Sequence, residues 1–194
     1  MKNIVIINVF IISILFSHCS TPNKQEVSKQ LKTSLRGDSQ EFMKSLKSIL
    51  VREIQTNGVA SAVSVCSDTA QILTNSFGIN KGIFIKRVSF KNRNKADYPD
   101  DIEAKALKYF EELKSKGELT DSAEYIEVVD EDNIKSVHYL KPILVQDACL
   151  NCHGSSEFIM PDVKAIINSK YPEDKATGYQ VGDLRGAISI QKTL

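Results

Sequence analysis

The residues best suited to chemistry lie in one short run late in the chain, Cys149-Leu150-Asn151-Cys152-His153-Gly154. Two thiols at this spacing can reach the two vinyl groups of one porphyrin, and the next residue can then place an imidazole on the iron. The pattern C-x-x-C-H is the attachment signature of c-type haem. The run therefore predicts one haem c, bound covalently through Cys149 and Cys152, with His153 as an axial iron ligand.

Two other kinds of site contain a C-x-x-C pair. In a thioredoxin-like protein Cys149 and Cys152 would form a redox disulfide, but there the motif opens a helix after a first strand. A structural zinc ion needs four ligands. His153 would then have to be joined by a distant residue such as Cys66 or His138. Both alternatives stay open at this stage, although the added histidine favours haem.

The start of the chain has the pattern of an export signal. Lys2 is followed by an apolar run over residues 4–16, which is shorter than the roughly 20 apolar residues of a membrane-spanning helix. A positive start and a short apolar core are typical of a secretory signal. We therefore expect residues 1–18 to be a signal peptide.

The end of this signal resembles a bacterial lipoprotein signal. Cys19 follows the apolar segment directly, and a short polar stretch comes after it, although His18 stands where Gly or Ala is usual. We expect residues 19–25 to comprise a lipidated Cys19 and its tether. This places the protein in the cell envelope, in the periplasm or on the outer face of a membrane, with the lipid as its membrane contact.

Composition excludes some functions. Lys and Arg total 25 and Asp and Glu total 24, a net charge of +1, so the chain lacks the basic character of a nucleic-acid-binding protein. Only His138 and His153 remain after removal of the signal, and no Ser/His/Asp constellation is present. We therefore expect no enzymatic activity and no nucleic-acid partner.

Hydrophobic periodicity predicts an α+β fold, an antiparallel sheet with helices packed on it. Residues 26–56 form a long amphipathic helix that Gly58 closes. In a strand over residues 60–66, every second side chain up to Cys66 would be small and would lie on one face. The remaining expected elements are helices over 100–116 and 161–169 and strands over 83–90, 125–129, 136–145 and 184–191.

Several further runs, in the right order, resemble a known family. They cover residues 62–66, 86–94, 139–143, 149–154, 176–179 and 182–190. They are similar to the PAS-like single-haem c-type cytochrome domain of bacteria and cyanobacteria, formerly a domain of unknown function, which occurs alone and in sensor proteins. The resemblance implies a PAS-like haem domain over residues 58–194, behind an N-terminal helix over 26–57.

The residues themselves do not fix the second axial ligand. They leave a choice between His138, Cys66 and an open sixth site, with Met43 and Met160 as further possible iron ligands. The resemblance implies Cys66. A thiolate opposite His153 would lower the iron potential, which favours a redox- or ligand-sensing role over a small membrane-anchored electron-transfer cytochrome. Either role requires a redox or signalling protein as partner.

Three arginines are candidates for haem propionates, because a guanidinium matches a carboxylate with two parallel hydrogen bonds. They are Arg87, Arg93 and Arg185. For each of them alone, an ordinary surface or strand-edge position is the competing interpretation.

Overall fold

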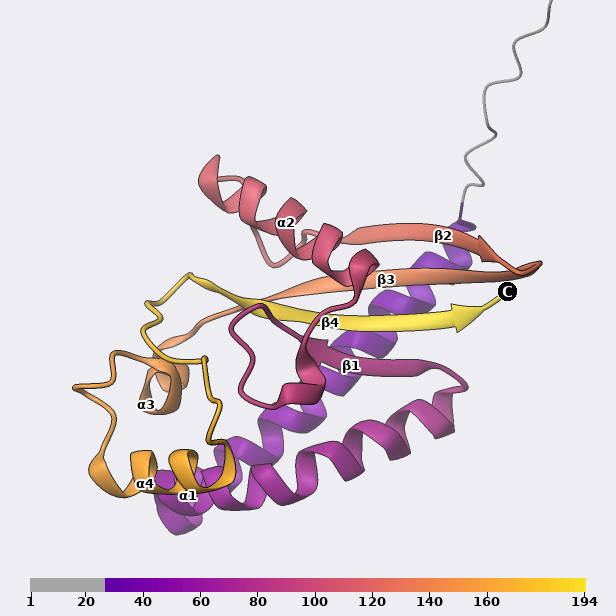
Figure 1. Cartoon of the computed structure of the whole chain (residues 1–194). Helices are drawn as coiled ribbons and strands as arrows, with labels where there is room; N and C mark the ends of the chain where they lie inside the picture. Colours follow the sequence, from indigo (N-terminus) through magenta and orange to yellow (C-terminus); the bar gives the residue numbers. More distant parts are fainter. Residues whose placement is uncertain (1–26) are drawn as a thin grey trace, which may run out of the picture.

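The protein is a four-stranded antiparallel sheet between helices (Figure 1), described by a computed structural model over residues 27–194. The expected signal peptide and Cys19 lie outside these residues. The strands are β1 (Phe84–Val88), β2 (Tyr125–Glu131), β3 (Ile134–Leu144) and β4 (Leu184–Thr193), in the order β1-β4-β3-β2. The α-helices are α1 (Lys29–Lys81), α2 (Asp101–Ser115), α3 (Leu150–His153) and α4 (Pro161–Lys170), and the 3-10 turns are η1 (Lys95–Asp97) and η2 (Asp147–Cys149). The predicted α+β class is confirmed.

Helices cover both faces of the sheet. Side chains alternate across a strand, so Val137 and Tyr139 face α1 whereas Leu140 faces α2. The buried cluster on the α1 side contains Leu35, Phe42, Ile83, Ile85, Val137, Tyr139, Ile188 and Ile190. The cluster on the α2 side contains Val88, Ala106, Leu107, Phe110, Leu140 and Ala187. Among the described residues, no helix has both the length and the apolar character needed to span a membrane.

α1 consists of two arms that meet at Gly58. Gly58 has φ 87° and ψ 171°, a combination that essentially only glycine adopts. The first arm, residues 29–57, passes behind the sheet, and the second arm, residues 59–81, runs back from the kink (Figure 1). Phe42 and Phe77 join the arms at 5.3 Å between ring centroids, and Lys81 Nζ lies 2.7 Å from Glu41. Residue 58, where the haem domain was expected to begin, therefore lies inside one helical element.

The strand expected over residues 60–66 is wrong, because this segment belongs to the second arm of α1. Val59, Val63 and Cys66 recur at helical spacing and share one side of the arm. Val59 and Val63 pack in an apolar cluster with α4. Val favours strands intrinsically, but packing against α4 decides the outcome here. The face of small residues expected for a strand therefore does not exist.

The other expected elements lie close to their predicted bounds. α2 starts with a capping box, in which Asp100 accepts from the Glu103 backbone and Glu103 accepts from the Asp100 backbone. α4 begins at Pro161, as expected. The hairpin between β2 and β3 turns at Asp132 and Asn133. Both have positive φ, as hairpin turns of this kind require.

A partly buried ion pair holds the first arm of α1 against the sheet. Arg36 donates to both carboxylate oxygens of Glu124, at 2.5 and 2.8 Å. The Tyr139 hydroxyl donates to the same carboxylate at 2.8 Å. These hydrogen bonds, chiefly that from Arg36, lower the pKa of Glu124 from its usual value of 4.5 to about 2.

Because of this ion pair, the stability of the fold should decrease at acid pH. Because the pKa of Glu124 is lowered in the folded state, ionised Glu124 stabilises the fold above about pH 4.5 and loses that effect as pH falls toward 2. Glu124→Gln should lower the unfolding free energy at pH 7 by about 1–2 kcal/mol, a range that allows for solvent screening at Arg36. Its stability should also change less between pH 4.5 and 2, as measured by denaturant titration. Glu118→Gln, on the exposed turn after α2, is the control, and equal acid sensitivity of the two variants would contradict this role.

Candidate cofactor-binding site

The cysteine pair follows directly after β3. The chain leaves β3 at Leu144 and turns through η2 into α3, so that Cys149 ends η2 while Cys152 and His153 lie in α3. The thiols are free and half-buried. Cys149 packs beside Val145, Ala176 and Tyr179, whereas Cys152 packs against α1 and α4. The two sulfur atoms are therefore held in different surroundings.

His153 is oriented by one backbone carbonyl. Its Nδ1 lies 2.7 Å from the oxygen of Ala176, and since a carbonyl only accepts, Nδ1 carries the proton. Nε2 is then unprotonated and able to bind a metal. Burial, assisted by the charges of Arg185 and Arg93, lowers the pKa of His153 to about 3. The imidazole is consequently neutral at physiological pH.

The segment before β4 lies along α3 and holds it in place. Tyr179 N donates to the His153 carbonyl at 3.0 Å, and Gly178 N donates to that of Gly154 at 2.8 Å. A Cβ on Gly154 would lie 2.7 Å from the backbone oxygen of Leu150. This close approach explains the glycine directly after His153.

Cys66 reaches the site from the second arm of α1. Val63, one turn before it, packs in the same cluster as Cys152. Burial raises the pKa of the Cys66 thiol, and the nearby charge of Arg87 opposes that shift. The pKa of Cys152 is raised first by burial, and the nearby Cys66 adds to the shift. Cys66 therefore lies near the Cys-x-x-Cys-His run, and it is carried by a helix and not by the strand expected from the sequence.

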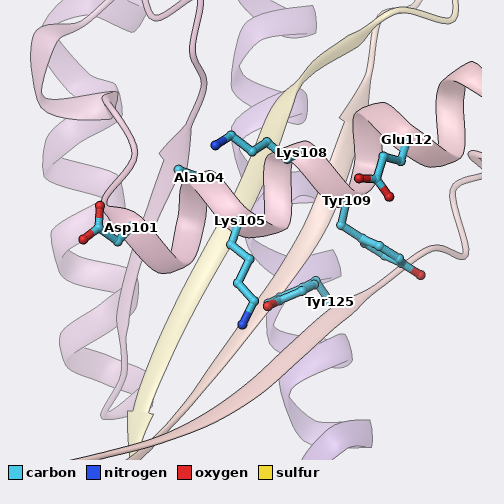
Figure 2. A pocket seen from close by; sticks show the side chains of 7 residues that line it. All are labelled: Asp101, Ala104, Lys105, Lys108, Tyr109, Glu112 and Tyr125. Carbon is cyan, nitrogen blue, oxygen red and sulfur yellow. The ribbon is translucent and has the colours of Figure 1, made fainter.

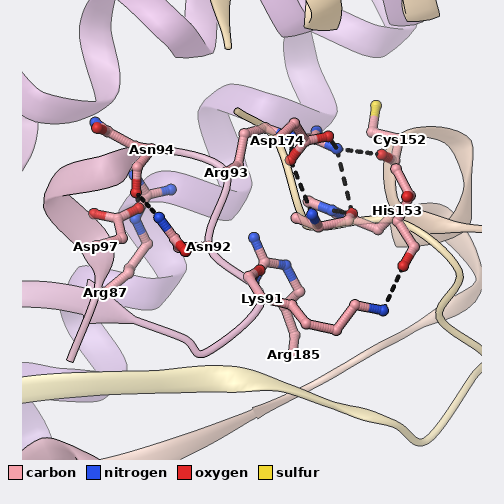
Figure 3. Close-up of polar contacts among 12 residues, drawn as sticks. Arg87, Lys91, Asn92, Arg93, Asn94, Asp97, Cys152, His153, Asp174 and Arg185 are labelled. Carbon is pink, nitrogen blue, oxygen red and sulfur yellow. Dashed lines mark hydrogen bonds and ion pairs between the residues drawn. The ribbon is translucent and has the colours of Figure 1, made fainter. Parts of the chain in front are cut away.

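The charges of the three predicted arginines all act on His153. Their side chains, however, have different partners (Figure 3). Arg93 is almost buried and already binds Asp174 together with the backbone oxygen of Cys152. Arg87, on β1, has its nearest carboxylate contact at Asp97, 4.0 Å away. Arg185 donates to the Lys91 carbonyl at 3.1 Å and lies over the Tyr179 ring. Arg87 and Arg185 therefore retain more capacity for an added anion than Arg93.

The other possible ligands lie elsewhere. His138 is buried on β3 opposite Glu127, and by alternation it faces the α2 side of the sheet, whereas Cys66 lies on the α1 side. Met43 packs with the α1 cluster, and Met160 is exposed. Within residues 27–194, no three His, Cys, Asp or Glu side chains are grouped so as to hold a metal ion. The described residues thus offer no four-ligand zinc site.

Sequence reasoning missed three residues that shape the site. Ala176 supplies the carbonyl for His153, Asp174 binds Arg93, and Tyr179 packs edge-on against His153 with 6.3 Å between ring centroids. Ala176 and Tyr179 belong to one of the runs that carried the family resemblance. No pattern in the sequence marked Asp174, because its role depends on a contact with a residue 81 positions away.

A surface groove of about 480 Å³ lies along α2 (Figure 2). Its lining consists of Asp101, Ala104, Lys105, Lys108, Tyr109, Glu112 and Tyr125. None of the site residues described above contributes to it. The groove is therefore separate from the Cys-x-x-Cys-His site.

Fold and site together define a PAS-like α+β domain with a Cys-x-x-Cys-His run beside its sheet. The chain belongs to the Tll0287-like family, whose model matches residues 22–192. Among solved structures it is similar to the crystal structure of the cyanobacterial heme-protein Tll0287, with a TM-score of 0.61 and 23% identity. That match covers 87% of this chain and 96% of the other. No curated protein matches the chain.

Proposed function

We propose that this protein is an exported c-type haem protein, with one haem bound covalently through Cys149 and Cys152 and ligated by His153. The observation that carries the proposal is the hydrogen bond from His153 Nδ1 to Ala176, because it leaves Nε2 available to iron beside two free thiols. The family relationship to a heme-protein supports it. When bound, haem supplies a one-electron couple at its iron.

The residues around the site suit haem in polarity and in charge. The apolar side chains near Cys152 come from α1 and α4 and can lie against a flat, apolar macrocycle. The charges of Arg87, Arg93 and Arg185 all act on His153, so an anionic group here would be favoured. We assign the haem propionates chiefly to Arg87 and Arg185, whose hydrogen-bonding capacity is less used.

Cys66 is our proposed second axial ligand. It comes from the second arm of α1, close enough for the charge of Arg87 to act on its thiol and for Cys66 to act on Cys152. Burial disfavours a free thiolate here, but metal coordination deprotonates a thiol outright. A thiolate opposite histidine donates charge to the iron and lowers its potential. This ligand pair favours ferric iron and therefore a redox- or ligand-sensing role, with a signalling or redox protein as partner.

The first prediction of this proposal concerns covalent attachment. The haem should stay with the wild-type polypeptide through acid-acetone extraction and denaturing electrophoresis, because thioether bonds survive both. The double variant Cys149→Ala/Cys152→Ala should lose all covalent haem, as measured by haem staining and pyridine haemochrome spectra. Cys66→Ser is the matched control and should keep it. Covalent haem in the double variant would contradict the proposal.

The second prediction concerns the sixth ligand. Cys66→Ser should alter the ferric absorption spectrum and raise the reduction potential, because the anionic sulfur ligand is lost. His138→Ala should change neither property, since His138 lies on the other side of the sheet. If Cys66→Ser leaves the spectrum and potential of wild type intact, the His/Cys pair is refuted and the electron-transfer cytochrome becomes the better interpretation.

The third prediction concerns membrane attachment. We propose that the mature chain begins at an acylated Cys19, so that the protein is held at a membrane in the cell envelope. Mass spectrometry of the mature protein should show a lipid-modified Cys19 as the first residue. Cys19→Ala should release the protein from the membrane fraction. A mature chain that starts downstream of Cys19 without a lipid would rule this out.

A further inference from the structure

We propose that Arg93 and Asp174 form a positioning pair that holds the Nδ1–H of His153 on the Ala176 carbonyl and so fixes the direction of Nε2. This positioning involves only residues of the protein itself and no cofactor. Only the last step, that Nε2 binds haem iron, rests on the proposed function. In this proposal Arg93 pairs with Asp174 and does not bind a haem propionate.

Arg93 joins three separate segments of the chain. Its Nε and Nη2 donate to the two carboxylate oxygens of Asp174, each at 3.1 Å. Nη2 also donates to the carbonyl oxygens of Cys152 at 2.6 Å and of Ala176 at 3.4 Å. Figure 3 shows the guanidinium between Asp174 and the backbone of Cys152. The loop after β1 is thereby fastened both to α3 and to the segment before β4.

Asp174 passes this constraint on to His153. Its Oδ1 accepts from the backbone N–H of Ala176 at 2.9 Å. The carbonyl of Ala176, in turn, accepts from His153 at 2.7 Å. The carboxylate thus fixes the residue whose carbonyl selects the imidazole tautomer and sets the ring plane.

Burial gives the pair its strength. The side chains of Arg93 and Asp174 are only 12% and 7% exposed. A buried pair whose donors and acceptors are satisfied is rigid, and removal of one partner leaves an uncompensated charge. That charge would lie next to the metal ligand. Asp174 therefore has two effects, because it places the Ala176 carbonyl and neutralises Arg93.

The two effects can be separated by the sign of the change in reduction potential. Asp174→Asn leaves the positive charge of Arg93 uncompensated, which disfavours ferric iron and should raise the potential. Arg93→Gln leaves the negative charge of Asp174 uncompensated, which favours ferric iron and should lower the potential. If the substitutions only loosened the site, the reduction potentials of both variants would shift in the same direction.

The matched control is a neighbouring ion pair on the same two segments. Lys95 and Glu173 lie 3.5 Å apart, with side chains 83% and 69% exposed. Glu173→Gln removes a carboxylate one residue from Asp174, and this carboxylate pairs with Lys95 and not with Arg93. It should leave both the His153 hydrogen bond and the potential as in wild type.

The first measurement does not depend on the cofactor. Nitrogen-15 NMR of the full chain as purified reports the His153 tautomer and the hydrogen exchange of its Nδ1–H. Exchange should be at least about fivefold faster in Asp174→Asn and Arg93→Gln, the factor expected when about one hydrogen bond is lost. Unchanged exchange in both variants would overturn the proposal. Amide exchange of the sheet shows whether each variant is folded.

The second measurement is the reduction potential of the same variants. Opposite shifts support the pair, and shifts of the same sign would overturn it in favour of general loosening. If Arg93→Gln does not fold, Arg93→Lys serves instead, because it keeps the charge but not the full set of hydrogen bonds. It should speed the exchange and leave the potential near wild type, and slow exchange as in wild type would count against the pair. A wild-type chain without covalent haem would refute the proposed function, while the exchange data would still decide the positioning role.

Discussion

Gly58 reverses the direction of α1, and the position of the second arm depends on that reversal. Its φ of 87° and ψ of 171° belong to a region that other residues reach only with strain. The first arm can therefore lie under the sheet while the second arm runs back beside α4. Cys66 is carried by this second arm, so its place near Cys152 follows from a backbone conformation eight residues earlier in the chain.

The sheet supplies the other half of the site. β3 delivers the chain into η2 and α3, and the segment before β4 returns alongside, so that the carbonyls of His153 and Gly154 accept from Tyr179 and Gly178. Because β3 and β4 are neighbours in the sheet, the ends of the two segments are fixed relative to each other. The cysteine pair therefore sits on backbone that is constrained from both sides, which suits a site that must keep a large ligand in one orientation.

Charge near the site is arranged unevenly. Arg87, Arg93 and Arg185 all act on His153, while Asp97 and Asp174 provide the nearby carboxylates. Asp174 is committed to Arg93 with two short contacts, whereas Asp97 is farther from Arg87. Arg93 is therefore occupied by a carboxylate of the protein itself, whereas Arg87 and Arg185 can bind an added anion. Burial keeps the imidazole neutral, which is the form that a metal requires.

The sequence by itself determined the features that depend on local pattern. The run from Cys149 to His153 marks its chemistry through residue type and spacing alone, and the amphipathic stripe and capping residues determine α2. Alternating apolar residues indicated the strands, since a half-buried sheet imposes a period of two. Several matched runs sufficed for the family. These signals are local, so no knowledge of distant contacts was needed to read them.

Only the tertiary structure decided the rest. Residues 59–66 fit a strand and a helix almost equally well as a pattern, and packing against α4 selected the helix. The sequence does not distinguish Arg93 from Arg87 and Arg185, because its partner Asp174 lies 81 residues away in the chain. Likewise, only the fold shows that His138 and Cys66 lie on opposite sides of the sheet. Contacts between residues far apart in sequence leave no periodic signal. The contact of Ala176 with His153, and that of Asp174 with Arg93, therefore become visible only in the fold.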